Sequence, residues 1–342
     1  MPTVQVRTAQ ELKNAFKLTS YEEDNVIEIL DDIDLNQSPF YFMPNSNFFE
    51  ISTTFPSKYY CNLIINGNGH TISNAYIYPS YSLFYIGSEV ANLTLNDLKI
   101  EAITNDSRVL HIGYKKSFSI NNCVFNVKCY TLANNATDYT DIYPIYLSSK
   151  EDNIQYFTNC IFNFYVASSG SSSHGILIYC SRPYSYSNSP KYYFEACIFK
   201  IRNFANNNLN LFGDRSIILD NCAIFYNYVG KNNSPSNLYI RYGTDGGPTK
   251  IQNTYFTSFG TATNSKPIIY VISVSNADEN PNKYILTSFY DSDKVNCKGY
   301  YYGGSWGWAT LGAADNCYPL TTAQCKDPNK LSEIGYIFAE ET

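Results

Sequence analysis

One short motif recurs along this chain of 342 residues, and it restricts the fold more than any other feature of the sequence. Its common order is apolar, polar, Asn, Cys, apolar, aromatic. The copies are Asn92–Ile100, Phe118–Phe125, Tyr156–Phe162, Tyr193–Phe199, Ile218–Ile224 and Lys250–Phe256. Their pivots are 25, 37, 37, 25 and 32 residues apart and fall at Leu98, Cys123, Cys160, Cys197, Cys222 and Thr254. A solenoid coil needs roughly 20–30 residues and tolerates insertions that loop out. The spacing therefore predicts an all-β solenoid, a single-stranded parallel β-helix.

The residue before each pivot is usually Asn. These residues are Asp97, Asn122, Asn159, Ala196, Asn221 and Asn253. Asn tolerates the left-handed backbone that a sharp bend between two strands requires. We therefore expect an asparagine ladder of stacked, hydrogen-bonded side chains beside a column of inward, reduced Cys side chains. This structural ladder comprises Asn122, Cys123, Asn159, Cys160, Cys197, Asn221, Cys222 and Asn253. Ala196 interrupts the series, and we expect its rung to differ locally.

Both ends of the chain depart from the repeat. We expect an N-terminal cap at residues 1–24, a parallel β-helix of roughly eight to ten coils at residues 25–292, and a C-terminal cap or assembly segment at residues 293–342. Thr8, followed by Glu11, is the capping-box signature of a short amphipathic helix that would cover the open end of the solenoid. The C-terminal cap contains a second helix-like segment at residues 321–326.

Charge and composition exclude several classes of partner and site. The net charge is −6, and nucleic acid requires a basic surface, so we expect no nucleic-acid partner. No run of 18 apolar residues is present, which predicts no membrane insertion. No apolar segment follows Met1, so we expect no secretory leader. The 10 Cys form no CxxC motif and only 3 His are present, so we expect no metal site and no cofactor.

Three groups of residues resemble the pectate-lyase-like family of right-handed parallel β-helices. They are the opening Asn25–Leu35, the coil at Asn66–Ile72 and the Asn-Cys-x-Phe rungs, which together cover most of residues 1–292. The segment Leu320–Asp327, with Leu331 and residues 334–338, is similar to the closing segment of β-helix proteins from gut bacteria and their phages. The family includes polysaccharide lyases, hydrolases, adhesins and phage tailspikes, so the resemblance implies the fold and leaves the activity open.

Catalytic β-helices of this kind use clustered carboxylates, which would have to occupy one position on adjacent coils. We find no such column, because we place Glu195 and Asp220 one position out of register. His174 faintly resembles part of a polygalacturonase motif, but the carboxylate motifs of that family are absent. We therefore predict no catalytic residue, and the sequence favours a non-enzymatic protein.

The chain contains 33 Tyr, several of them in clusters. Tyr and Trp anchor interfaces and stack on sugars, because they offer a large area at a small entropic cost. Packing of these rings against the solenoid is an equally good explanation. The predicted binding residues are Tyr76, Tyr78, Tyr81, Tyr143, Tyr184, Tyr186, Trp306 and Trp308.

A rigid solenoid without a leader or a catalytic column favours a phage virion structural protein, such as a head fibre, a decoration protein or a tailspike-like protein. Its partners would be host-surface polysaccharide or other virion proteins. It would be located in the virion and made in the host cytoplasm, with an extracellular location as the alternative. A polysaccharide lyase or glycoside hydrolase and a bacterial surface adhesin remain alternative functions. A homotrimer is left open, since tailspikes trimerise but no coiled-coil heptads are present.

Overall fold

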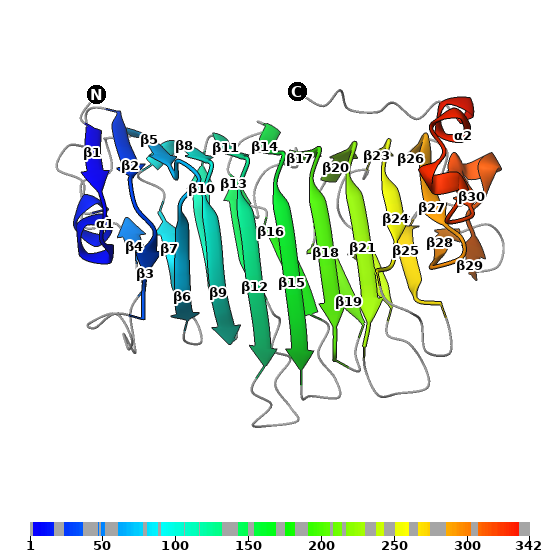
Figure 1. Ribbon diagram of the computed structural model, residues 1–342, viewed down its shortest axis with the longest axis horizontal. Coiled ribbons are helices and arrows are strands. Elements are labelled where there is room, and N and C mark those ends of the chain that lie inside the picture. Colours follow the sequence, from blue (N-terminus) through cyan, green and yellow to red (C-terminus); the bar gives the residue numbers. More distant parts are fainter. Residues whose placement is uncertain are drawn as a thin grey trace.

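The protein is a single elongated solenoid of stacked coils (Figure 1). It is seen in a computed structural model that describes residues 3–16, 24–36, 47, 49–51, 61–77, 81–87, 90–105, 107–115, 117–131, 143–149, 154–168, 175–181, 191–205, 208–213, 217–229, 237–242, 250–259, 266–273, 285–301 and 307–334. Three ten-stranded sheets form its sides. The all-β parallel β-helix predicted from the repeat is confirmed.

The strands of one sheet come from successive coils. Sheet A consists of β1 (Thr3–Val6), β2 (Asn25–Ile29), β5 (Cys61–Asn66), β8 (Val90–Asn96), β11 (Ser117–Asn121), β14 (Ile154–Thr158), β17 (Lys191–Glu195), β20 (Ile217–Asp220), β23 (Lys250–Gln252) and β26 (Ile285–Leu286). Sheet B consists of β3 (Ile33–Asp34), β6 (Thr71–Ile77), β9 (Lys99–Asn105), β12 (Val124–Thr131), β15 (Ile161–Ser168), β18 (Ile198–Asn203), β21 (Ala223–Tyr228), β24 (Tyr255–Thr257), β27 (Ser288–Asp291) and β30 (Cys317–Leu320). Sheet C consists of β4 (Phe49–Ile51), β7 (Ser82–Ile86), β10 (Arg108–Lys115), β13 (Ile145–Ser149), β16 (Gly175–Ser181), β19 (Leu209–Gly213), β22 (Leu238–Tyr242), β25 (Ile268–Ser273), β28 (Asn296–Tyr301) and β29 (Gly307–Thr310).

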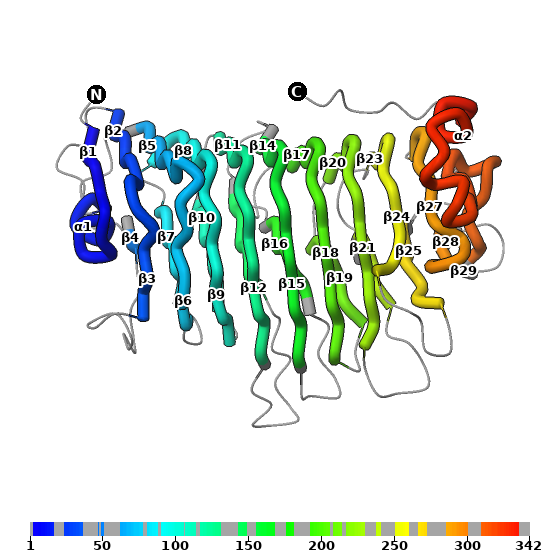
Figure 2. The backbone as a smooth tube through the Cα atoms, viewed as in Figure 1, coloured from blue at the N-terminus to red at the C-terminus, as the bar shows by residue number. Residues whose placement is uncertain are grey.

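The stacking order follows the sequence from one end of the solenoid to the other (Figure 2). Neighbouring strands pair in parallel, apart from β28 and β29, which are antiparallel. Nine strands of sheet A, β2 to β26, lie within residues 25–292, in agreement with the predicted number of coils. Alternate residues of each strand point inward, so the interior is one continuous apolar column.

The bend between sheets A and B has the predicted left-handed backbone. The φ angles lie between 47° and 54° at Asp97, Asn122, Asn159, Ala196, Asn221 and Asn253. The expectation that the rung at Ala196 differs is wrong for the backbone, because its φ of 52° matches those of its neighbours. Only the Asn side chain is missing there.

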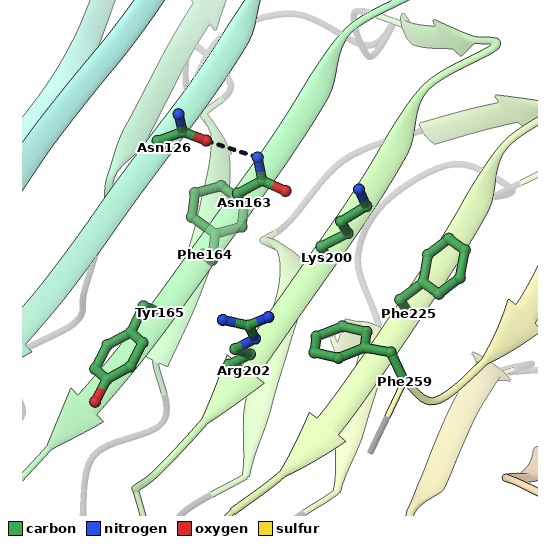
Figure 3. Close-up of a pocket in the computed structure, with 8 residues that line it drawn as sticks. All are labelled: Asn126, Asn163, Phe164, Tyr165, Lys200, Arg202, Phe225 and Phe259. Atoms are coloured by element: carbon green, nitrogen blue, oxygen red, sulfur yellow. Dashed lines mark hydrogen bonds between the residues drawn. The ribbon is translucent and has the colours of Figure 1, made fainter.

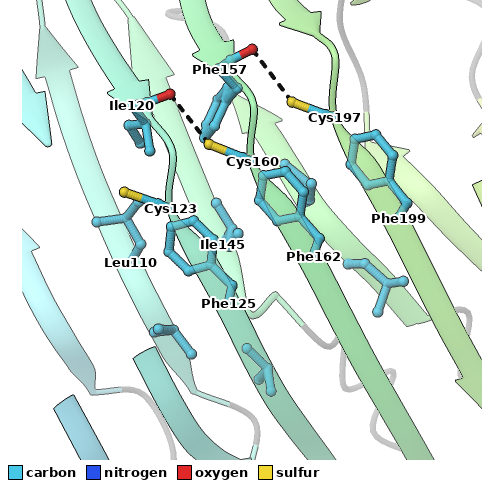
Figure 4. Packing of buried hydrophobic residues seen from close by; sticks show 14 of the residues in the cluster. Leu110, Ile120, Cys123, Phe125, Ile145, Phe157, Cys160, Phe162, Cys197 and Phe199 are labelled. Atoms are coloured by element: carbon cyan, nitrogen blue, oxygen red, sulfur yellow. Dashed lines mark hydrogen bonds between the residues drawn. The ribbon is translucent and has the colours of Figure 1, made fainter. Parts of the chain in front are cut away.

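The pivot Cys side chains point inward as predicted and are unpaired (Figure 4). Each of these thiols lies within hydrogen-bond distance of two backbone carbonyl oxygens. The Cys160 thiol, for example, donates to Ile120 O at 3.3 Å and to Thr158 O at 3.4 Å. Burial raises the pKa of the Cys197 thiol. Thr254 continues the column, since its hydroxyl donates to Gln252 O at 2.9 Å. From Cys123 onward the pivot is thus a small side chain that can donate to a carbonyl of the bend.

The asparagine ladder is mainly one residue earlier than predicted. At the bend, Asn122 donates to Asp97 Oδ1 at 3.0 Å, whereas Asn253 donates to Asp220 Oδ1 at 3.4 Å, one residue before the bend position. A continuous run lies instead on the outer face of sheet A, on the last residues of β5, β8 and β11 and on the residue before the last of β2. It links Glu28, Asn66, Asn96 and Asn121 through three hydrogen bonds of 2.7, 2.9 and 2.9 Å. In this coil Asn121 extends the ladder and Asn122 makes the left-handed turn.

Stacked phenyl rings fill the interior behind the bend (Figure 4). The rings of Phe125 and Phe162 lie 5.2 Å apart at an angle of 4°, and those of Phe162 and Phe199 lie 5.0 Å apart at 6°. All three side chains are fully buried. These are the aromatic positions of the repeat. The repeated aromatic residue is therefore the one that packs each coil on the next.

Helices stand at both ends of the solenoid (Figure 1). The predicted N-terminal helix is confirmed as α1 (Ala9–Ala15), with Thr8 and Glu11 forming a capping box. Leu12 and Phe16 are buried in the main core. At the other end, the predicted helix-like segment is a turn followed by the 3-10 helix η3 (Gln324–Lys326), while the α-helix α2 (Pro328–Glu333) begins later. Asp327 caps α2 and Pro328 opens it, a signal that the sequence prediction overlooked. In the described part of the chain, no helix has the length and apolarity to cross a bilayer.

Candidate functional site

Four aromatic rings form a row on the outer face of sheet C. Tyr85, His111, Tyr146 and Tyr179 face one another in register on β7, β10, β13 and β16. Successive ring centroids lie 4.6, 4.6 and 5.3 Å apart. All four side chains are half-buried. We call this row the aromatic strip; it runs along the solenoid axis across four coils.

Arg108 and Tyr143 widen the strip on one side. The Arg108 guanidinium carbon lies 4.8 Å from the centroid of the Tyr146 ring and 5.9 Å from that of Tyr143. The Tyr143 ring lies 4.8 Å from that of Tyr179. Cation–π attraction of this kind is strongest where the cation is partly desolvated, as it is at the half-buried Arg108. The strip therefore combines half-buried aromatic rings with one cation.

A glycine ends the continuous part of the strip. Gly213 on β19 is in register with Tyr179. A Cβ at this position would lie 2.9 Å from Cδ2 of Tyr179 and 3.0 Å from Cγ2 of Ile176. Glycine therefore provides the space that these side chains occupy. On the next two strands the rings of Tyr239 and Tyr270 stack at 4.5 Å, but Tyr239 is in register with Asn210 and not with Gly213, so this pair does not continue the strip.

A groove lies on the outer face of sheet B, with a volume of about 710 Å³ (Figure 3). Its lining comprises Asn126, Asn163, Phe164, Tyr165, Lys200, Arg202, Phe225 and Phe259. Strands β12, β15, β18 and β21 supply most of these residues, so the groove spans four coils. We call it the basic groove because its charged lining residues are Lys200 and Arg202.

Comparison with known families adds a description to this geometry. Residues 3–139 match the pectate lyase-like adhesive domain family, and the coils of the structure continue through β30. The chain is a right-handed parallel β-helix, and its residues 3–139 are similar to this adhesive domain family. The match covers about two-fifths of the chain and ends before β13. No curated protein and no solved structure has significant similarity to the chain.

The outer face of sheet A corrects one sequence interpretation. Glu195 and Asp220 are in register on adjacent strands, not one position apart. Both stand two residues before a pivot Cys, so counting back from the pivots would have aligned them. The Tyr193 hydroxyl donates to Asp220 Oδ2 at 2.7 Å, and burial, with this hydrogen bond, raises the pKa of Tyr193. Among the described residues, no three His, Cys, Asp or Glu side chains gather as they would around a metal ion.

The predicted binding residues are dispersed over the β-helix. Tyr143 belongs to the aromatic strip, whereas Tyr76 lies on sheet B with 45% of its surface exposed. Tyr81 packs against the main core, and Trp308 lies on β29 opposite Tyr300. Four further positions lie outside the described residues, namely Tyr78, Tyr184, Tyr186 and Trp306.

The sequence prediction missed most of the aromatic strip, although a signal for it exists. Each ring of the strip stands between two apolar residues, as in Phe84-Tyr85-Ile86 and Ile145-Tyr146-Leu147. The same triplet recurs around His111, Tyr179, Tyr239 and Tyr270. A strand with one outward aromatic per coil predicts a row of rings once the coils are aligned. The prediction was based on Tyr residues that are close together in the sequence. The rings of the strip come from different coils and are far apart in the sequence.

Proposed function

We propose that this protein is a non-catalytic adhesive β-helix that holds a polysaccharide along the aromatic strip. The observation that carries the proposal is the row of four rings on consecutive coils. The adhesive family description of residues 3–139 supports it. A bacterial surface adhesin is the alternative from the sequence that this observation favours.

The geometry of the strip suits a long repeating ligand. Its rings succeed one another at 4.6 to 5.3 Å along the solenoid axis, so a chain lying along the axis would meet one ring per coil. The apolar faces of sugar rings stack on aromatic faces. Since each ring of the strip packs against its neighbours, little side-chain entropy is lost on binding. Arg108 offers hydrogen-bond donors beside the row.

The other sequence-based alternatives have less support. The fold and the family match do not distinguish a virion protein from a cell-surface protein, so the virion location and the homotrimer stay predictions. The paired Glu195 and Asp220 are the strongest feature for a hydrolase. They lie on sheet A, whereas the row of rings lies on sheet C. A ligand on the strip would therefore be held away from these carboxylates.

The test is binding of the protein to a panel of neutral and acidic polysaccharides, measured by affinity electrophoresis and calorimetry. We expect Tyr146→Ala and Tyr179→Ala each to weaken binding about tenfold, the loss typical of a well-packed interface aromatic. Tyr76→Ala, which removes an exposed ring outside the strip, is the matched control and should bind as the wild type does.

An assay for new reducing ends and unsaturated uronates accompanies the binding measurement. We expect no cleavage. Cleavage that disappears in Glu195→Gln and Asp220→Asn would replace the adhesive function with a hydrolytic one. Equal weakening by Tyr76→Ala and Tyr146→Ala would show that binding does not use the strip.

A further inference from the structure

The basic groove concentrates positive charge on an acidic protein. The net charge of the chain is −6, yet Lys200 and Arg202 both project from the outer face of β18 into one hollow of about 710 Å³. Both are exposed. Within the described ranges, neither forms an ion pair with a carboxylate. Lys128 is a third cation on this face of sheet B. The strand register places Lys128 on one side of Tyr165 and Arg202 on the other.

The Arg202 guanidinium is held by a ring and not by an acid. Its central carbon lies 5.1 Å from the centroid of Phe259, a side chain with 39% of its surface exposed. Stacking on a ring leaves the edges of a guanidinium available, and its fork of N–H donors matches a carboxylate in two parallel hydrogen bonds. Arg202 is thus oriented without being neutralised.

The remaining lining offers contacts for a sugar chain. Asn163 Nδ2 donates to Asn126 Oδ1 at 2.6 Å, so the two amides form a fixed polar edge beside Lys200 (Figure 3). The ring centroids of Phe225 and Phe259 lie 6.3 Å apart, and the two rings form an apolar wall of the groove. Amides suit hydroxyl groups, apolar rings suit the faces of sugar rings, and the two cations suit acidic substituents.

From this arrangement we propose that the basic groove is a second binding site, separate from the aromatic strip, and that it takes an acidic polysaccharide through the carboxylates of its uronate residues. Nucleic acid is a poorer match, because its affinity comes from many neutralised phosphates and this protein is acidic overall. The site does not depend on the proposed function of the strip, since it lies on a different sheet.

The experiment is calorimetric titration of the full chain with an oligouronate and with the same oligomer after methyl esterification of its carboxyl groups. We expect the acid form to bind and the ester to bind at least about tenfold more weakly, in line with the loss of charge-assisted hydrogen bonds. Lys200→Gln/Arg202→Gln should weaken binding of the acid form about 100-fold, about tenfold for each charged contact. Lys250→Gln, an exposed cation on sheet A, is the control and should leave affinity unchanged.

Two further arms separate the alternatives. Binding of the oligouronate should fall as salt is raised, because the cations are exposed. Tyr146→Ala should not affect it, so failure of the strip and failure of the groove are distinguishable. Equal binding of acid and ester, equal weakening by Lys250→Gln, no binding of either oligomer, or tighter binding of a single-stranded oligonucleotide would each overturn the proposal.

Discussion

Sheets B and C present different surfaces on the same coils, a hollow with two exposed cations on sheet B and a row of rings on sheet C. In the segment from β15 to β16, Tyr165 faces the basic groove and Tyr179 belongs to the aromatic strip. The inward residues of both strands, such as Phe162 and Ile178, are equally buried in one core. Stability therefore depends on the inward positions of each coil, which leaves the outward positions free to form different surfaces. The two faces can change independently as long as the interior is kept.

Phe162→Ala should destabilise the coils that carry both the basic groove and the aromatic strip. This ring stacks between Phe125 and Phe199, and its removal leaves a cavity in a rigid interior. We expect a loss of about 3–5 kcal/mol in the free energy of unfolding. Urea denaturation followed by circular dichroism measures it. Leu286→Ala, at an exposed outward position, should cost less than about 0.5 kcal/mol and serves as the control.

High pH should also lower the stability of the coils that carry both surfaces, because a buried thiol in their common interior would ionise. Burial raises the pKa of Cys129 on β12 to about 12 from an ordinary value near 9.0. The folded state keeps this proton where the unfolded state loses it, so the stabilisation is complete below about pH 9 and is lost as pH rises through about pH 12, with a limit of about 4 kcal/mol.

Unfolding measured from about pH 8 to about pH 11 should show this decline for the wild type. Cys129→Ala should be less stable at neutral pH but should have a shallower dependence in the alkaline range. An unchanged slope in the variant would contradict the assignment to Cys129.

Gly213→Ala should affect the strip alone. The added Cβ would lie 2.9 Å from the Tyr179 ring, which must move. We expect a loss of stability of about 1 kcal/mol and weaker polysaccharide binding at the strip, with no change at the groove. Gly113→Ala is the matched control, because its Cβ would make only ordinary contacts, the nearest at 3.6 Å. Unchanged binding by Gly213→Ala would show that the position of Tyr179 does not matter.

Ala196→Asn should strengthen the scaffold and leave both faces unchanged. Ala196 has a φ of 52°, a left-handed conformation that costs an alanine about 1–2 kcal/mol and that Asn adopts more readily. We expect a gain of about 1 kcal/mol and a higher melting temperature in calorimetry. Asn159→Ala, the reverse change one coil away, should lower stability by a similar amount.

Much of the architecture could be predicted from the sequence, because the bend and the core depend on residues close together in the chain. The left-handed turn at Asn122 and the inward Cys123 follow from residue type and spacing alone. The surfaces could not be predicted in the same way. Whether Glu195 meets Asp220, or Tyr146 meets Tyr179, depends on strand register between coils, and loops of unequal length hide that register in the linear sequence. Aligning the coils on their pivots recovers the first pair, and aligning the aromatic triplets recovers the second.

The caps give this solenoid a finite length. A stack of parallel coils resembles the growing end of a fibril, in which each exposed strand edge recruits the next chain. Here α1, a helix of only 7 residues, buries Leu12 at one end, its C-cap residue Phe16 is buried beside it, and together they terminate the stack. The folded chain therefore resembles a short segment of a fibril whose N-terminal end is covered by its own helix. Because the other end stays covered by the segment that contains α2, deletion of α1 would open one end and favour pairing of two chains through it, whereas open-ended polymerisation would need both ends to be uncovered.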